Sequence, residues 1–398
     1  LSCAPAPRPR TTPLTHSAYV WRQGWTAQAV EGLSAKPLPA QLGALNVLVG
    51  ECGLSSGRKP VHPPWPTLSA LGRTISLSVR IGTRQAIGKD GRVDLSEGFS
   101  LLMSGLAEAR QAEVPVASLQ IDFDCPERLL AAYAGELRTF RKNQTELPLT
   151  ITALPAWLDA KGFDELIAST DGWTLQLHGT NRPKLGQTNQ LFSAKVAQYW
   201  IDTAKSYGRP FRVALPTYAY VACFGQRGEY LGMHAEQSSF PMGTRRTLPL
   251  PAEPREVTRL LRLIDDAKYE QVVGVDWFRL PLPGDRQNWT MHGFGEILAG
   301  HDLPDRLELV TVQHDGLYDF SVRNPSDQPL ALPSVKIVWS QGHVIGVDAT
   351  AAWRTDVSRR TITFAGRDFV ELIGPGETRV VGWLRLSEAQ TLSTEIIR

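Results

Sequence analysis

The stretch Leu119-Gln-Ile-Asp-Phe-Asp-Cys-Pro126 begins as an apolar strand and ends in two carboxylates. Side chains alternate between the two sides of a strand, so Gln120, Asp122 and Asp124 share one side. The other side is apolar, with Leu119, Ile121 and Phe123. In a β/α barrel the carboxyl ends of the strands form the floor of the active site. The stretch therefore predicts a barrel strand that carries two carboxylates into such a site.

The rest of the first three quarters of the chain repeats a strand–helix pattern. Further predicted strands span residues 17–21, 45–51, 74–80, 149–154, 173–178, 211–218 and 272–279. Apolar residues at helical spacing predict helices over residues 26–33, 95–112, 127–142, 190–206, 254–268 and 293–298. This alternation indicates a parallel sheet, and eight strands in roughly 285 residues favour an α/β fold of the (β/α)8 TIM-barrel type. Residues 220–253 are expected to form a long loop.

The composition changes near Asp302. Short runs of alternating polar and apolar residues follow, separated by turn signals such as Asn324-Pro325, over residues 307–312, 316–322, 335–339, 360–364 and 378–384. This pattern predicts a small all-β sandwich domain. The expected domains are a disordered tether over residues 1–15, the barrel over 16–301 and the sandwich over 302–398.

The N-terminal residues Leu1-Ser2-Cys3 resemble the end of a bacterial lipoprotein signal. In such a signal the cysteine is lipidated after cleavage, and the proline-rich run that ends at Pro13 would form an extended tether. The resemblance implies an exported protein, anchored to a membrane through Cys3 and facing the periplasm or the cell exterior. The alternative is an ordinary disordered N-terminus that contains a cysteine by chance.

Composition excludes several classes of partner. The formal net charge is +2, which gives no nucleic-acid footprint. No run approaches the roughly 18 apolar residues of a membrane span. There is no C-x-x-C motif and no His/Cys spacing typical of zinc, so neither a metal nor another cofactor is expected. Cys52, Cys125 and Cys223 are expected to be buried thiols, or else two of them form a disulfide.

Three carboxyl groups at predicted strand ends are the candidate catalytic residues. Asp122 and Asp124 would share one pocket of low dielectric constant, where mutual repulsion raises the pKa of one of them. A carboxyl group of raised pKa is suited to act as a general acid, and Asp124, nearer the mouth, is the expected acid. Glu51 ends the second predicted strand and is the candidate base or nucleophile. Glycoside hydrolysis uses two carboxyl groups of this kind.

Aromatic and basic residues at the same strand ends are the candidate substrate-binding groups. They are Trp21, Arg80, Trp157, His178, Tyr218, Trp277 and Arg279. The aromatic rings suit stacking on sugar faces, and the arginines supply positive charge. Each also has a structural interpretation, because tryptophans commonly fill cores and Asp122 could form a buried ion pair with Arg80 or Arg279.

Several segments together resemble an uncharacterised bacterial family, domain of unknown function 3142. These are Ala18-Tyr-Val-Trp21, Leu119–Pro126, Thr152-Ala-Leu-Pro-Ala-Trp157, Leu177-His-Gly179 and Trp277-Phe-Arg-Leu-Pro281. The resemblance covers roughly residues 15 to 300 and implies an exported barrel protein, without an activity.

The Asp-x-Asp strand also distantly resembles the Asp-x-x-Asp-x-Asp-x-Glu strand of chitinase-type glycoside hydrolases. Pro126 stands where that family has its acid, and Glu127 comes one position later. The mechanism of that family therefore does not transfer to this chain as it stands.

Two functional classes fit the sequence. The first is an exported glycoside hydrolase-like barrel that acts on or binds a polysaccharide through carboxylates at the strand ends. The second is a non-catalytic glycan-binding or envelope-assembly lipoprotein on a barrel scaffold. A metal-assisted hydrolase that uses Asp122, Asp124, Glu51 and His178 is weaker, because no local ligand spacing points to it. Nothing in the sequence specifies an oligomeric state.

Overall fold

A closed barrel forms the larger part of the molecule. The computed structural model describes residues 9–35, 37–54, 57–144, 146–179, 181–235, 239–366 and 372–397. β1 pairs in parallel with both β12 and β2, which closes the ring and confirms the predicted α/β barrel. In barrel order its eight strands are β1 (Thr15–Val20), β2 (Leu42–Leu54), β4 (Thr74–Ile81), β5 (Val116–Phe123), β6 (Leu149–Ala153), β7 (Gly172–Gln176), β8 (Phe211–Pro216) and β12 (Val272–Phe278).

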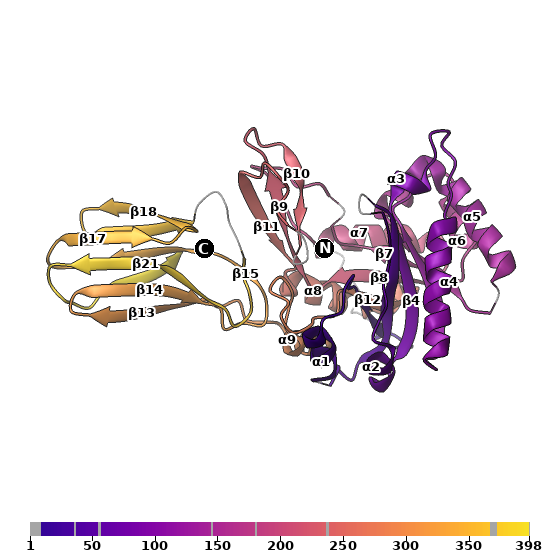
Figure 1. The fold of residues 1–398 in the computed structure, drawn as a ribbon, viewed down its shortest axis with the longest axis horizontal. Coiled ribbons are helices and arrows are strands. Elements are labelled where there is room, and N and C mark those ends of the chain that lie inside the picture. Colours follow the sequence, from indigo (N-terminus) through magenta and orange to yellow (C-terminus); the bar gives the residue numbers. More distant parts are fainter. Residues whose placement is uncertain are drawn as a thin grey trace, which may run out of the picture.

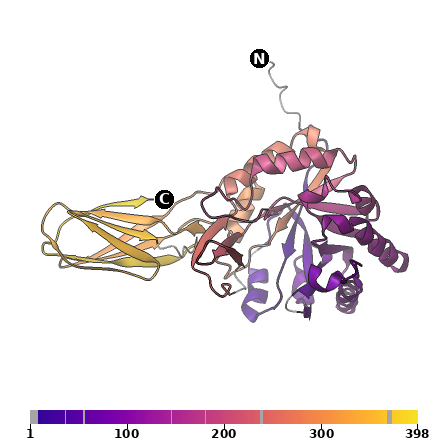
Figure 2. The ribbon, with the colours of Figure 1, turned by 90° about the horizontal axis from the view of Figure 1, so that it is seen from above.

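Helices surround the barrel, as Figure 2 shows. They are α1 (Ala27–Ala35), α2 (Trp65–Ala70), α3 (Thr83–Ala86), α4 (Ser96–Gln111), α5 (Leu130–Asn143), α6 (Phe163–Ala168), α7 (Ala194–Lys205), α8 (Pro254–Ile264) and α9 (Met291–Leu298). Short 3-10 turns lie at η1 (Glu127–Leu129), η2 (Pro155–Trp157) and η3 (Ala267–Tyr269). Within the described residues, no helix is both long and apolar enough to cross a membrane.

Close packing of α4 on the barrel depends on glycine. A Cβ added at Gly105 would lie 2.6 Å from the Cβ of Val49 on β2, and one added at Gly98 would lie 2.2 Å from Cδ1 of Ile81 on β4. Real side chains do not approach so closely, so these glycines let the helix axis lie nearer the strands. The position of α4 holds β2 and β4, and with them their polar ends, in place.

The two faces of the barrel strands differ in chemistry, as the period-two pattern predicts. On β5, Leu119, Ile121 and Phe123 are fully buried in the layer between barrel and helices. Gln120 points inward and accepts a hydrogen bond from the Ser78 hydroxyl on β4, with an Oγ–Oε1 distance of 3.2 Å. The barrel therefore has an apolar outer wall and a partly polar interior, and its polar row continues to the open end of the barrel.

Strands over residues 219–224, 230–234 and 246–251 form a second, smaller sheet, so the expected long loop is wrong. β9 (Ala219–Phe224) pairs antiparallel with both β10 (Tyr230–His234) and β11 (Arg246–Pro251). A further short strand, β3 (Gly57–Pro60), pairs antiparallel with the end of β2. Both additions extend from the carboxyl ends of barrel strands, and Tyr220 of β9 and Met233 of β10 line the mouth.

The C-terminal region is all β, as predicted. One sheet has the order β13 (Glu308–His314), β14 (Leu317–Arg323), β21 (Thr378–Leu386), β17 (Val344–Ala349). The other has the order β18 (Trp353–Ser358), β19 (Thr361–Gly366), β16 (Ser334–Val338), β22 (Ser393–Ile397), and β15 (Leu330–Ala331) pairs with β20 (Leu372–Ile373). Phe320, Ile337, Trp353 and Phe364 lie in the core of this domain.

The small sheet of β9–β11 lies between the barrel and the sandwich domain (Figure 1). Ala219 and Val221 on β9 pack with Leu372 of the sandwich. Arg286 donates to a carboxylate oxygen of Glu377 at 2.7 Å across the same junction. The sandwich thus supports the back of a sheet whose other side faces the barrel mouth.

Candidate active site

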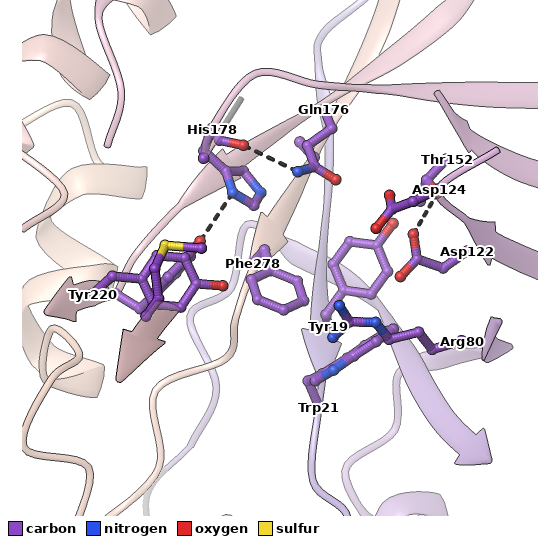
Figure 3. Close-up of a pocket in the computed structure, with 14 residues that line it drawn as sticks. Tyr19, Trp21, Arg80, Asp122, Asp124, Thr152, Gln176, His178, Tyr220 and Phe278 are labelled. Atoms are coloured by element: carbon purple, nitrogen blue, oxygen red, sulfur yellow. Dashed lines mark hydrogen bonds between the residues drawn. The ribbon is translucent and has the colours of Figure 1, made fainter. Parts of the chain in front are cut away.

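A cavity of about 180 Å³ opens at the carboxyl ends of the barrel strands. Figure 3 shows its side chains converging from β1, β4, β5, β6, β7 and β12, with the β9–β11 sheet on one side. The lining residues are Tyr19, Trp21, Arg80, Asp122, Asp124, Thr152, Gln176, His178, Gly179, Ala214, Tyr218, Tyr220, Met233 and Phe278. Two carboxyl groups, one guanidinium and several aromatic rings therefore meet in one concave site, which is the usual composition of a ligand pocket.

Asp122 and Asp124 are in different environments although they belong to one strand end. Asp122 accepts a hydrogen bond from the Thr152 hydroxyl, with an Oγ1–Oδ1 distance of 2.6 Å. Asp124 is exposed to the cavity. Desolvation by the surrounding protein, with repulsion from Asp122, raises the pKa of Asp124 to about 6, against the opposing effect of Arg80. One carboxyl group is thus held by a hydrogen-bond donor, while the other keeps its proton up to about pH 6, well above the ordinary range of an Asp.

A second cavity of about 290 Å³ adjoins the first. The two share Trp21, Arg80, Tyr218, Tyr220, Met233 and Phe278, so they form one continuous cleft. Glu51 lines the second cavity and accepts a hydrogen bond from the Gln23 amide. Burial raises the pKa of Glu51, although Arg80 and Gln23 oppose the shift.

His178 and Tyr218 form a buried pair on the wall opposite the acids. The His178 Nδ1 lies 3.1 Å from the Tyr218 hydroxyl, and the imidazole stacks on Phe278 with ring centroids 5.5 Å apart. Burial lowers the pKa of His178 to about 3. The ring is therefore neutral at ordinary pH, so His178 is suited to position Tyr218 rather than to transfer a proton.

Replacing His178 with Phe is expected to leave the pH dependence of any activity unchanged, because a neutral ring contributes no titration near pH 6 or 7. Loss of its bond to Tyr218 should lower the rate by about tenfold, the usual effect of one hydrogen bond. A pH–rate profile of the variant beside the wild type measures both effects. Disappearance of a titration near neutrality in the variant would contradict the neutral state assigned to His178.

The structure places most of the predicted site residues in this cleft. Asp122, Asp124, Trp21, Arg80, His178 and Tyr218 line the first cavity, and Glu51 and Arg279 line the second. Arg279 also forms an ion pair with Asp285 at 3.5 Å, and Asp285 forms a second ion pair with Arg22 at 3.0 Å. The alternative of a buried ion pair between Asp122 and Arg80 or Arg279 is not formed, and Asp122 accepts a hydrogen bond from Thr152. Cys3 lies outside the described residues.

Two predicted stacking residues do not reach the cleft. Trp157 is buried in η2, where its indole donates to the Cys125 carbonyl at 3.0 Å. Trp277 is buried outside the barrel wall and packs on Phe294 of α9, with centroids 5.3 Å apart. For Trp277 the reason is the alternation of side chains along the strand, since the inward positions next to it belong to Asp276 and Phe278. Both tryptophans are core residues.

Several lining residues were missed by the sequence analysis. Tyr19, Thr152 and Phe278 lie at inward positions of strands that the sequence does predict, so the period-two pattern contained their signal. Met233 has no such signal, because it belongs to β10, a strand that the sequence pattern does not predict.

The departure from the chitinase-type pattern is visible in the structure. Glu127 is exposed at the start of η1 and lines neither cavity. Among the described residues no three His, Cys, Asp or Glu side chains cluster to hold a metal ion, so the mixed site of Asp122, Asp124, Glu51 and His178 is not assembled. Cys52, Cys125 and Cys223 are buried and free, so no two of them form a disulfide.

Comparison with known families gives one assignment. Residues 72–283 match the family described as Domain of unknown function (DUF3142). The chain belongs to this family. The matched region of this DUF3142 protein runs from before β4 to beyond β12 and so includes the Asp-x-Asp strand. No curated protein sequence is significantly similar to the chain.

Solved structures include barrels that resemble this DUF3142 protein loosely. The spore cortex-lytic enzyme SleL of Bacillus cereus aligns with a TM-score of 0.49 at 12% identity, over 74% of this chain and 75% of that one. Chitinase ChiA74 of Bacillus thuringiensis aligns with a TM-score of 0.45 at 9% identity, over 96% of this chain and 100% of that one. A chitinase of Bacteroides thetaiotaomicron aligns with a TM-score of 0.47 at 13% identity, over 67% of this chain and 90% of that one. All three scores are below 0.5, so these likenesses add nothing about the site.

Proposed function

We propose that this protein binds a polysaccharide in the cleft at the barrel mouth and hydrolyses a glycosidic bond there. The observation that carries the proposal is Asp124, a carboxyl group exposed to the cavity, with a pKa of about 6, beside Asp122. A carboxylic acid of raised pKa, which keeps its proton up to about pH 6, is the group that glycoside hydrolysis needs at the leaving oxygen.

The proposed chemistry assigns a role to each carboxyl group. Asp124 donates its proton to the glycosidic oxygen as the bond from that oxygen to the anomeric carbon breaks. Asp122, fixed by Thr152, places negative charge near the cationic anomeric centre that develops. Glu51 is the candidate base for the attacking water or the candidate nucleophile, from the adjoining cavity. The aromatic residues shared by both cavities would stack on the sugar rings.

The test is reducing-sugar release from a panel of bacterial and plant polysaccharides between pH 4 and pH 9. Because only protonated Asp124 can act as the acid, the rate should fall as pH rises through about 6. The fall should follow one titration and approach tenfold per pH unit. Release that rises with pH above about 6 would contradict the role of Asp124.

A non-catalytic glycan-binding protein is the second candidate. Pro126 stands where the chitinase-type pattern has its acid, and the neighbouring Glu127 lines neither cavity. Binding to immobilised polysaccharide without release of reducing sugar from any polymer of the panel would favour this second function.

Export and a lipid anchor at Cys3 complete the proposal. The support is the Leu1-Ser2-Cys3 sequence and the proline-rich run after it. Mass spectrometry of the N-terminal peptide from cells that express the full-length gene is the test. A peptide that begins at Cys3 and carries a diacylglyceryl group is expected, and an unmodified Cys3 within a longer chain would contradict it.

A further inference from the structure

Arg80 lies where the two cavities of the cleft meet. It extends from the end of β4 and lines both the cavity of Asp122 and Asp124 and the cavity of Glu51. In Figure 3 its guanidinium lies beside Tyr19 and Trp21, on the cavity side of the strands. A sugar chain that occupies both cavities must pass this group.

The N–H donors of the Arg80 guanidinium are available to bind a ligand. Arg22, Arg212 and Arg279 each form an ion pair with a carboxylate. For Arg80, by contrast, no hydrogen bond or ion pair occurs among the described residues. Burial lowers the pKa of Arg80, but the fields of Asp122, Asp124 and Glu51 outweigh it and raise that pKa, so the group stays charged. A charged guanidinium carries five N–H donors in a planar fork, and here they face the cleft.

The charges of the second cavity indicate what kind of group those donors would bind. Its charged lining residues are Arg80, Arg279 and Glu51. Two guanidinium groups accompany one carboxyl group, so this lining carries net positive charge even with Glu51 ionised. The first cavity, with Asp122 and Asp124, has the opposite balance. An anionic group of the ligand is therefore favoured on the Glu51 side of Arg80.

We propose that the glycan bound here carries carboxylated sugar units, and that Arg80 binds the carboxylate of the unit in the second cavity. A carboxylate matches the guanidinium fork with two parallel hydrogen bonds, which a hydroxyl group cannot do. Trp21 and Tyr220, which line both cavities, offer faces for the ring of the same unit. The inference rests on the proposed glycan binding at the barrel mouth, but not on catalysis.

The test compares each polymer with its own carboxyl-reduced form. Polygalacturonate and hyaluronan are the acidic probes, and reduction of their carboxyl groups to alcohols keeps linkage and backbone while removing the charge. Affinity is measured by retardation in gels that contain each polymer, with Asp124→Asn present throughout so that turnover does not consume the probe. At least one acidic polymer should bind about tenfold or more tightly than its reduced form.

Arg80→Gln should remove this preference by weakening acidic binding to about the level of the reduced polymer, with a much smaller effect on binding of the reduced polymer itself. Arg80→Lys keeps the charge without the fork and should retain part of the preference. Arg354→Gln, on exposed β18 of the sandwich domain, is the matched control and should behave as the unsubstituted protein. Thermal unfolding of each variant verifies that it is folded.

Three outcomes overturn the inference. Equal weakening of acidic and reduced polymers by Arg80→Gln would make Arg80 a counter-charge for Asp122 and Asp124 only. Binding of neutral polymers alone would leave the proposed glycan function intact and remove the acidic substrate. Binding of no polymer at all would remove both. An acidic preference that depends on Arg80, without hydrolysis by the wild type, would support the inference and favour the non-catalytic function.

Discussion

Substitution of Asp124 by Asn is expected to lower reducing-sugar release by about 10²- to 10⁴-fold, the usual contribution of a general acid. The amide has nearly the same shape but has no acidic proton to give to the leaving oxygen. Binding of the polysaccharide should change little, because the cleft keeps its walls. Asp319→Asn, at an exposed position of β14 in the sandwich domain, is the matched control and should keep full activity.

The same substitution is expected to stabilise the fold in alkaline solution. The pKa of Asp124 is about 6 in the folded protein, against 3.8 for an ordinary Asp. Between these values the folded state binds more protons than the unfolded state, so the free energy of unfolding falls as pH rises, and the full penalty is present above pH 6. Because the side chain is exposed to the cavity, solvent screening reduces this penalty to about 1 kcal/mol.

Urea unfolding at pH 8 and at pH 4 separates catalysis from structure. Asp124→Asn should be more stable than the wild type at pH 8 and nearly equal to it at pH 4. An inactive variant that is also more stable is typical of a group placed for function at the expense of stability. If Asp124→Asn were instead less stable at pH 8, the loss of activity would have to be assigned to a structural role.

The barrel was predictable because its strands repeat one simple pattern. Residues on the Asp-x-Asp strand, on 74–80 and on 173–178 alternate between apolar and polar, and the structure turns their polar members into the barrel. Gln120, Arg80 and His178 lie where that alternation requires. The local pattern suffices here, because the strand face that packs on the helices must be apolar.

What the sequence could not provide are the contacts between distant segments. Trp157 and Trp277 are near strand ends in sequence, but local geometry turns each indole into the core. Met233 enters the cleft only because β9–β11 fold back over the mouth. The alternation places Thr152 at an inward position, but only the structure shows that its hydroxyl donates to Asp122 on an adjacent strand. Such pairings depend on the closure of the barrel.

A buried ion pair does exist inside the barrel, but at the end opposite the cleft. Arg212 on β8 donates from Nε to Asp276 on β12 at 2.7 Å, and the Asp276 side chain is only 2% exposed. Asp276 also accepts hydrogen bonds from Ser17 and from Thr174, the latter at 2.7 Å. These residues line a cavity at the amino ends of the strands, the end that in such barrels serves stability rather than catalysis.

Arg212→Met is therefore expected to destabilise the protein by about 3–5 kcal/mol, because it leaves a buried carboxylate without its charged partner. Urea unfolding at pH 7 measures the loss, and exposed Arg209→Met is the matched control, with a change below about 0.5 kcal/mol. The double variant Arg212→Met/Asp276→Leu should recover a large part of the loss, since it removes the unpaired charge as well.

A measurement of polysaccharide binding distinguishes the roles of the two ends of the barrel. Folded Arg212→Met should bind as the wild type does, because neither Arg212 nor Asp276 lines either cavity of the cleft. A loss of stability below 1 kcal/mol would show that Ser17 and Thr174 are enough to hold the charge of Asp276. A loss of binding by the folded variant would show that the two ends are coupled. The expected result is a large loss of stability with no change in polysaccharide binding. It would confine function to the mouth, where Asp122, Asp124 and Arg80 meet.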